Sequence, residues 1–105
     1  MPLPKSSGKL RKPRPFLLRR VSGDSMLPRL RPGQLVLAVP LRRRLQPGQL
    51  VIVRHDGLEK VKRIERLDGN RVFVVGDNPA DSTDSRQFGW LDRELVVARV
   101  LLPRR

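Results

Sequence analysis

The sequence has 105 residues, which is enough for one small domain with a modest hydrophobic core. It has no cysteine and a single histidine, His55, so disulfides, thiolate metal sites and multi-histidine centres are excluded, and we expect neither metal nor cofactor. The formal net charge of +13 predicts attraction to polyanions, and no run approaches the roughly 20 apolar residues of a membrane span. We therefore expect a soluble, cytoplasmic protein without a transmembrane anchor and with at most weak electrostatic association with membranes.

The charge is distributed unevenly along the chain. Residues 1–23 carry seven Lys or Arg and no acidic residue, whereas residues 76–94 hold five of the ten acidic residues. Charge concentrated at chain ends is typical of solvated tails. The four aromatic rings are scattered, whereas nucleic-acid-binding platforms cluster theirs. A basic nucleic-acid-binding module stays an alternative, but we expect no specific nucleic-acid partner.

In chain order, residues 1–15 come first and are rich in proline and basic residues, which predicts a disordered tail before a single domain of residues 16–105. A seven-residue pattern then occurs twice, as LRPGQLV at Leu30–Val36 and LQPGQLV at Leu45–Val51. Pro-Gly suits the two central positions of a type II turn. Each copy leads into an apolar run, which predicts strands at Leu35–Val39 and Leu50–Val53.

Further short, apolar runs predict three more strands, at Lys60–Ile64, Arg71–Val75 and Leu95–Leu102. The stretch 59–67 is ambiguous, because Glu59 and Arg63 would also pair at helical spacing. No segment has a helical apolar stripe longer than two turns. Short strands separated by Gly and Pro predict an all-β fold, a small curled antiparallel sheet or partial barrel.

Ser25 lies in a turn-prone stretch, Ser22-Gly23-Asp24-Ser25, directly before apolar residues. A serine hydroxyl is almost never ionised near neutral pH, so it becomes a nucleophile only beside a base. His55 is one candidate base, but it stands at the predicted end of a strand next to Asp56-Gly57, where a histidine is most often a turn residue.

Lysine is the other candidate base. From residue 13 onward the chain has seventeen arginines but only two lysines, Lys60 and Lys62. Arginine cannot serve, because its pKa stays above about 12. A lysine can serve if burial lowers its pKa, and Val61 and Ile64 offer apolar surroundings for Lys62.

A polar segment, residues 76–89, reads GDNPADSTDSRQFG and concentrates acidic residues in a basic chain. Its residue types hydrogen-bond their own backbone, so a plain polar loop is one interpretation. Ordering so polar a loop requires internal pairs, such as Asp84 with Arg86.

Three separated segments together resemble the catalytic boxes of type I signal peptidases, the serine–lysine peptidase family. They are SGDSMLP at 22–28, VKRI at 61–64 and the GDN to DSR stretch at 76–86. One box alone would be weak, because Ser-Met is common, but all three occur in the family's order. The resemblance covers residues 21 to about 102.

The resemblance implies that Ser25 is the acyl nucleophile and Lys62 its general base, in a serine-type endopeptidase. Ser82 would hydrogen-bond to the lysine and orient it. The loop would be held by salt bridges that involve Asp77, Asp84 and Arg86.

The same resemblance places the oxyanion hole and the specificity pocket. The main-chain N–H of Ser25 would donate to the oxyanion. Some family members add a hydroxyl from two residues before the nucleophile, where this chain has Gly23, so that donor is absent. Met26 resembles the residue beside the pocket for the small side chain that precedes the cut.

Two departures narrow the resemblance. The sequence predicts neither the N-terminal membrane helix nor the membrane-dipping apolar surface usual in the family, and Arg29 stands where threonine is usual. Its STDSRQFG ending, Ser82–Gly89, looks most like that of the maturation proteases of nickel-type superoxide dismutase. The implied partner is the dismutase precursor, whose N-terminal extension would be removed to expose a nickel-ligating histidine.

A second enzyme hypothesis is the self-cleaving domain of SOS-type repressors, which shares the Ser–Lys chemistry. Against it, the sequence predicts no helix-turn-helix ahead of Val21 and has no obvious internal Ala-Gly cleavage site.

Overall fold

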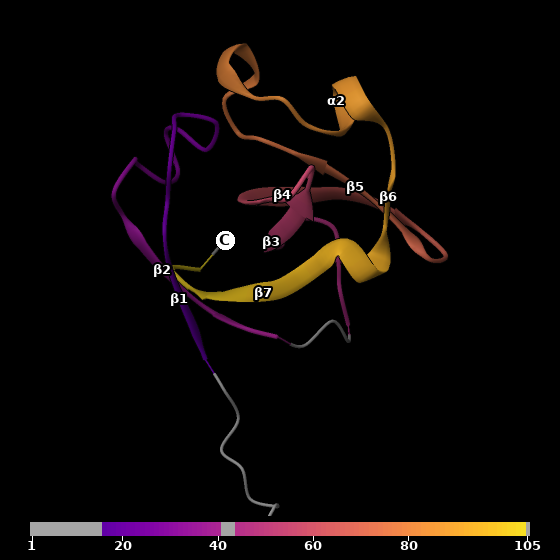
Figure 1. The fold of residues 1–105 in the computed structure, drawn as a ribbon, viewed down its shortest axis with the longest axis horizontal. Coiled ribbons are helices and arrows are strands. Elements are labelled where there is room, and N and C mark those ends of the chain that lie inside the picture. The colour runs from indigo at the N-terminus through magenta and orange to yellow at the C-terminus, as the bar shows by residue number, and fades with distance from the viewer. Residues whose placement is uncertain (1–15, 41–43, 105) are drawn as a thin grey trace, which may run out of the picture.

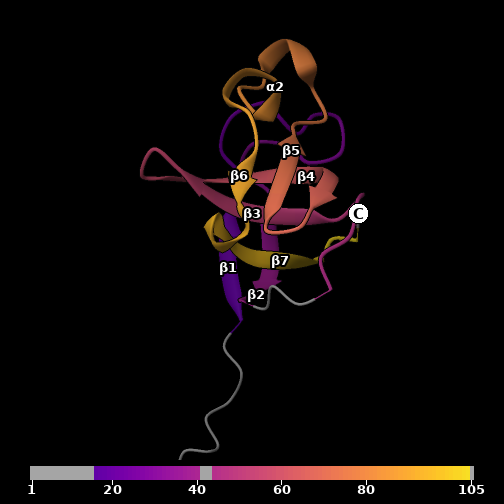
Figure 2. The same cartoon turned by 90° about the vertical axis from the view of Figure 1, so that its right-hand side faces the viewer.

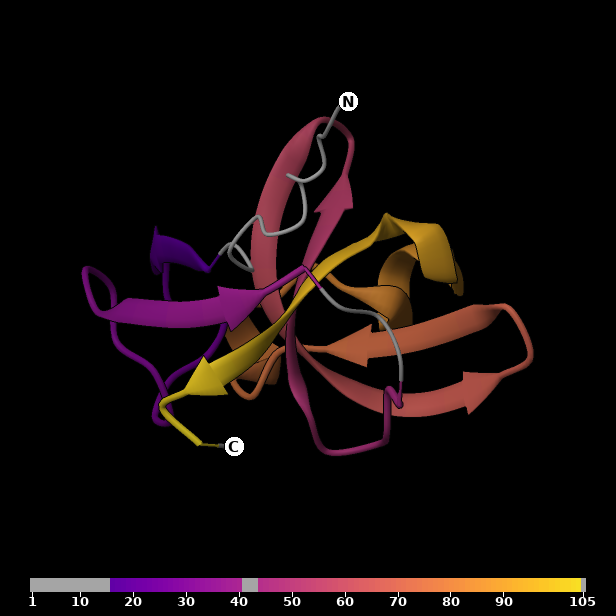
Figure 3. The same cartoon turned by 90° about the horizontal axis from the view of Figure 1, so that it is seen from below.

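The computed structural model describes residues 16–40 and 44–104. The predicted disordered tail, residues 1–15, lies outside the described residues. The described chain forms one antiparallel sheet with strand order β1-β2-β7-β3-β4-β5-β6. Its strands are β1 (Leu17–Arg20), β2 (Leu35–Val39), β3 (Leu50–His55), β4 (Leu58–Asp68), β5 (Arg71–Val75), β6 (Leu91–Asp92) and β7 (Val96–Leu102). The sheet is open and curled, and its hairpins point in different directions (Figure 3), which confirms the all-β prediction.

The two copies of the Pro-Gly pattern form the same turn. Gly33 and Gly48 have φ angles of 86° and 92°, a left-handed conformation that glycine adopts without strain. In each copy the following glutamine closes the turn, because its N–H donates to the carbonyl three residues earlier, at 3.0 and 3.3 Å. Its side-chain oxygen accepts from the N–H of that same residue at 3.0 Å in both copies.

Each turn also bonds to one other segment of the chain. The first turn bonds to Val21 through two main-chain hydrogen bonds of 2.7 and 2.8 Å, and so closes the base of the loop that carries Ser25. The second turn bonds to Ile64 through two of 2.7 and 2.9 Å, two residues beyond Lys62. Each copy of the pattern therefore positions one segment that carries a candidate catalytic residue.

The longest strand, β4, includes the whole stretch whose type the sequence left ambiguous. It pairs with β3 along one half and with β5 along the other, with an irregularity between Ile64 and Arg66. Glu59 and Arg63 pair with other partners, not with each other: Glu59 accepts from Arg19 and Arg54, and Arg63 binds Asp77. The helical alternative for this stretch is therefore wrong.

Both faces of the central strands are covered by apolar side chains. One cluster is built on the face of Val51, Val53 and Ile64, and a second contains Val21, Met26, Leu30, Val36 and Leu50. The second cluster anchors the loop that follows β1. In two perpendicular views this loop lies at the same end of the molecule as the segment between β5 and β6, which carries the short helix α2 (Ser85–Phe88) (Figures 1 and 2).

Candidate active site

Ser25 lies in a tight turn of the loop between β1 and β2 and is half-buried. The turn is closed by hydrogen bonds from Leu27 N–H to the Asp24 carbonyl (3.2 Å) and from Leu30 N–H to the Met26 carbonyl (2.9 Å). Met26 and Leu30 are buried, so two apolar anchors fix the loop directly after the serine.

Lys62 lies on β4, opposite Val51 of β3, and only 3 % of its surface is exposed. The other lysine of this strand, Lys60, is exposed. Burial lowers the pKa of Lys62, because the ammonium loses its hydration. The Asp84 carboxylate raises this pKa in part, while the charges of Lys60 and Arg86 lower it further. The two lysines that the sequence could not tell apart by composition therefore differ in burial.

A chain of hydrogen bonds extends from Lys62 into the polar segment of residues 76–89, which we call the acidic loop. Lys62 Nζ lies 3.0 Å from Ser82 Oγ, and the Ser82 hydroxyl donates to Asp84 Oδ2. Asp84 is fully buried and also accepts from Arg86 Nη2 (2.6 Å), Arg86 Nε (2.9 Å) and Gly76 N–H (2.8 Å). The Ser82 proton is therefore directed to the carboxylate, which can only accept, so Ser82 accepts an N–H from Lys62.

The buried carboxylate stays ionised within this network. Burial alone would raise the pKa of Asp84, but the hydrogen bonds from Arg86, Ser82 and the Gly76 N–H together hold it well below the usual range. Asp84 also caps α2: its side chain accepts from Arg86 N–H at 3.0 Å, and the Gln87 side chain accepts from Asp84 N–H at 2.8 Å. One aspartate thus fixes both Ser82 and the helix that follows it.

Two further residues, Gly76 and Asn78, connect the loop of Ser25 to this network, although sequence reasoning gave them no role of their own. Asn78 donates from its N–H to the Ser25 carbonyl (2.8 Å) and from Nδ2 to the Asp24 carbonyl (3.0 Å). A Cβ placed on Gly76 would stand 2.3 Å from Ser82 Oγ and 2.6 Å from the Ser25 carbonyl oxygen. The backbone of Ser25 and the side chain of Ser82 therefore both lie against Gly76, where there is no room for a side chain.

The structure places the remaining predicted site residues as follows. Asp77 forms a two-pronged ion pair with Arg63 of β4, with both contacts at 2.8 Å, so it ties the acidic loop to the lysine strand. Gly23 is exposed with φ of 78°, which makes it a turn residue whose backbone requires glycine. His55 ends β3, and its ring stacks on Phe88 with the ring centroids 3.9 Å apart. Among the described residues, His55 makes no hydrogen bond to Ser25.

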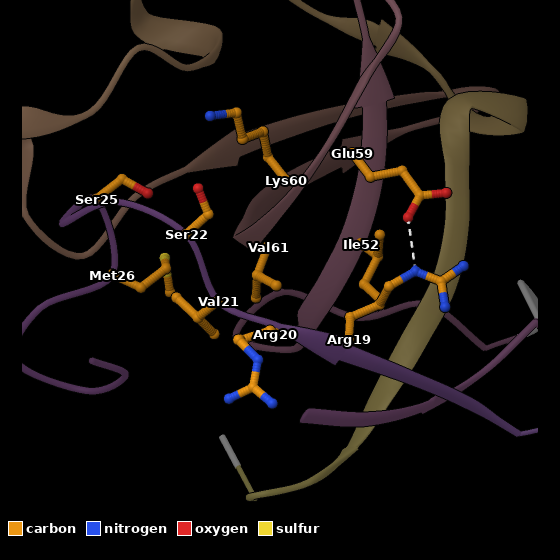
Figure 4. Close-up of a pocket in the computed structure, with 10 residues that line it drawn as sticks. All are labelled: Arg19, Arg20, Val21, Ser22, Ser25, Met26, Ile52, Glu59, Lys60 and Val61. Atoms are coloured by element: carbon orange, nitrogen blue, oxygen red, sulfur yellow. Dashed lines mark hydrogen bonds and ion pairs between the residues drawn. The ribbon is translucent and has the colours of Figure 1, made fainter. Parts of the chain in front are cut away.

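A small pocket of about 60 Å³ lies beside Ser25 (Figure 4). Met26, Ile52 and Val61 contribute apolar walls. Ser25 and Lys60 lie at one end of the pocket, and the ion pair between Arg19 and Glu59 (2.8 Å) lies at the other. The two arginine contacts of Glu59 lower its pKa, against the opposing effect of burial. We call this space the Ser25 pocket. Its size suits a small side chain next to Ser25.

Over residues 1–97 the sequence matches the family described as Peptidase S24-like. The chain belongs to the Peptidase S24-like family. Membership makes it a serine peptidase of the Ser–Lys superfamily, so the resemblance drawn from the three motifs is right at that level. A search of the curated proteins found no match.

Two findings concern groups and surfaces outside this network. Within the described ranges, no three His, Asp or Glu side chains gather where they could hold a metal ion. None of the helices in the described part of this Peptidase S24-like chain is long and apolar enough to cross a membrane.

Proposed function

We propose that the protein is a Ser–Lys endopeptidase in which Ser25 is the nucleophile, Lys62 the general base, and residues 16–105 the catalytic domain. The observation that supports this most strongly is the state of Lys62. It is buried, its pKa is lowered by that burial, and it is bonded to Ser82 in a network that also contacts the loop of Ser25. Burial of Lys62 does not help to stabilise the fold, because burying an ammonium costs free energy.

The proposed mechanism uses this network as a proton path. A neutral Lys62 amine has two N–H donors and one lone pair; one N–H is given to Ser82, and the lone pair is left to take the proton of Ser25 Oγ as it attacks the scissile carbonyl. The ammonium then returns the proton to the leaving amine, and water hydrolyses the acyl-enzyme by the same route. The Ser25 N–H would donate to the oxyanion, with Gly23 adding no side-chain donor.

For the substrate, we propose a precursor protein from which a short N-terminal extension is removed, as in the pro-form of nickel-type superoxide dismutase. The support is the likeness of Ser82–Gly89 to the maturation proteases of that enzyme and the small volume of the Ser25 pocket, with Met26 on its wall. A small side chain before the cut would fit that volume, and a large one would be too big for it.

The test is mass spectrometry of the precursor after incubation with purified protein and its variants. Ser25→Ala and Lys62→Arg should fold and leave the precursor uncut, because arginine cannot cycle its proton at neutral pH. Arg66→Lys is the control: it is a Lys/Arg exchange on the same strand, at an exposed side chain that does not line the Ser25 pocket, and we expect it to retain most of the wild-type kcat. Wild-type turnover by Lys62→Arg would show that the mechanism is wrong.

Self-cleavage is the second candidate, favoured by the Peptidase S24-like match. The two functions are separated by incubating the purified chain alone at several concentrations. A self-cleaving domain would cut itself at a rate independent of concentration and would leave an added precursor intact. The proposed endopeptidase would stay whole and cut the precursor.

A further inference from the structure

A second pocket, of about 240 Å³, opens beside Lys62. Its lining includes Lys62 and Thr83 but not Ser25, whereas the Ser25 pocket includes Ser25 but not Lys62. Lys60 lines both, so the two pockets adjoin at that side chain. The proposed nucleophile and the proposed base thus each face a pocket of their own.

The chemistry of peptide cleavage gives the two pockets a direction. The acyl part of the substrate becomes bonded to Ser25, so its last side chain lies in the Ser25 pocket. The leaving amine must come within hydrogen-bond reach of Lys62 Nζ to receive its proton. The first residue of the leaving segment therefore begins beside Lys62, at the mouth of the second pocket.

The second pocket also differs in size and lining. Val53, Leu58 and Phe88 give it apolar walls, and the His55 ring lies against Phe88 with ring centroids 3.9 Å apart and planes 20° from parallel. Its volume is four times that of the Ser25 pocket. An engineered apolar cavity of about 150 Å³ is enough to hold a benzene molecule. The space and its walls therefore suit a ring or a branched apolar side chain.

We propose that this second pocket, the leaving-side pocket, binds the side chain of the first residue after the scissile bond and selects a large apolar or ring-bearing one. This inference rests on the proposed Ser–Lys endopeptidase function. It assigns specificity to Leu58 and Phe88, which none of the catalytic motifs includes. Leu58 is 59 % exposed at the rim, so an incoming side chain would cover apolar surface that the fold leaves in water.

The test begins with a proteome-derived peptide library incubated with wild-type protein, with Ser25→Ala as the blank, and the cut sites read by mass spectrometry. Two peptides that differ only in Phe or Ala after the cut are then compared by kcat/KM. We expect a ratio of roughly tenfold or more in favour of Phe, in the range that one apolar pocket contact gives. Phe88→Ala and Leu58→Asp should each bring the ratio towards one.

Phe73→Ala is the matched control, because it removes a ring from β5 that does not line the leaving-side pocket, and the ratio should persist. If Phe88→Ala fails to fold, Leu58→Asp decides, since it changes an exposed side chain. Cleavage that depends on Ser25 but shows no preference after the cut would overturn this inference and leave the proposed function standing. Absence of any Ser25-dependent cleavage would overturn both.

Discussion

Replacing Gly76 by alanine adds a single methyl group at the point where the loop of Ser25 meets Ser82. The new Cβ would lie 2.3 Å from Ser82 Oγ and 2.6 Å from the Ser25 carbonyl oxygen, against 3.4–4 Å for ordinary contact. The two segments must therefore move apart by about 1 Å. A misplacement of that size at a reacting centre costs about 100-fold in rate, or about 2.7 kcal/mol of transition-state free energy.

The assay is kcat/KM on a cleaved peptide, measured beside the thermal midpoint of unfolding. We expect Gly76→Ala to fold with a loss of about 1–3 kcal/mol from overpacking, and to lose activity far beyond its loss of stability. Gly69→Ala is the control: a Cβ there meets nothing within 4 Å, but φ is +58°, so it costs stability through backbone strain without touching the site. Wild-type kcat/KM in a folded Gly76→Ala protein would refute the convergence of the two segments as the basis of activity.

Three further predictions follow from the charges of the site. Because burial lowers the pKa of Lys62, kcat/KM should rise with pH along a limb centred below the ordinary lysine value of about 10.4; a limb at that value or higher would contradict the proposed base. Lys62→Met should abolish cleavage yet raise the free energy of unfolding by about 1 kcal/mol at pH 7, a gain that disappears at high pH, where the wild-type lysine is neutral in both folded and unfolded states. Asp84→Asn should lower the free energy of unfolding by about 3 kcal/mol at pH 7 in urea titrations. Since the pKa of Asp84 is lowered by folding, its stabilisation is complete above the unfolded value of about 3.9 and is lost as pH falls, so Asp84→Asn should lose less stability than the wild type below pH 4.

The strands that follow the two Pro-Gly turns were predictable, because turn chemistry and β-branched runs agree there. The strand β5 (Arg71–Val75) matches its prediction at both ends. The strands β1 and β6 were missed, because four and two residues carry too little local pattern. Their pairing is set by the neighbouring strands: β1 pairs with Leu35–Ala38 of β2, and β6 pairs with Arg71–Val72 of β5.

The site divides in the same way. Residue types single out a serine, two lysines and an acidic loop. Lys60 and Lys62 lie two residues apart on β4 and so share one face, and what separates them is that Ser82 of the acidic loop meets Lys62, which is buried, while Lys60 stays exposed. Asn78 and Gly76 act through the backbone of Ser25, more than fifty residues away in the chain. A glycine or an asparagine in a loop does not by itself indicate a contact with a distant segment, so the local sequence pattern could not predict it.

The duplicated Pro-Gly turn has a consequence for how the domain opens. One copy holds the loop of Ser25, which belongs to the cluster around Met26 and Leu30, and the other holds β4 at Ile64, which belongs to the opposite cluster. A covalent inhibitor attached to Ser25 and bonded to Lys62 would therefore link the two clusters. Amide hydrogen exchange should then slow around both turns together, because each turn holds one of the two segments that the inhibitor would bridge.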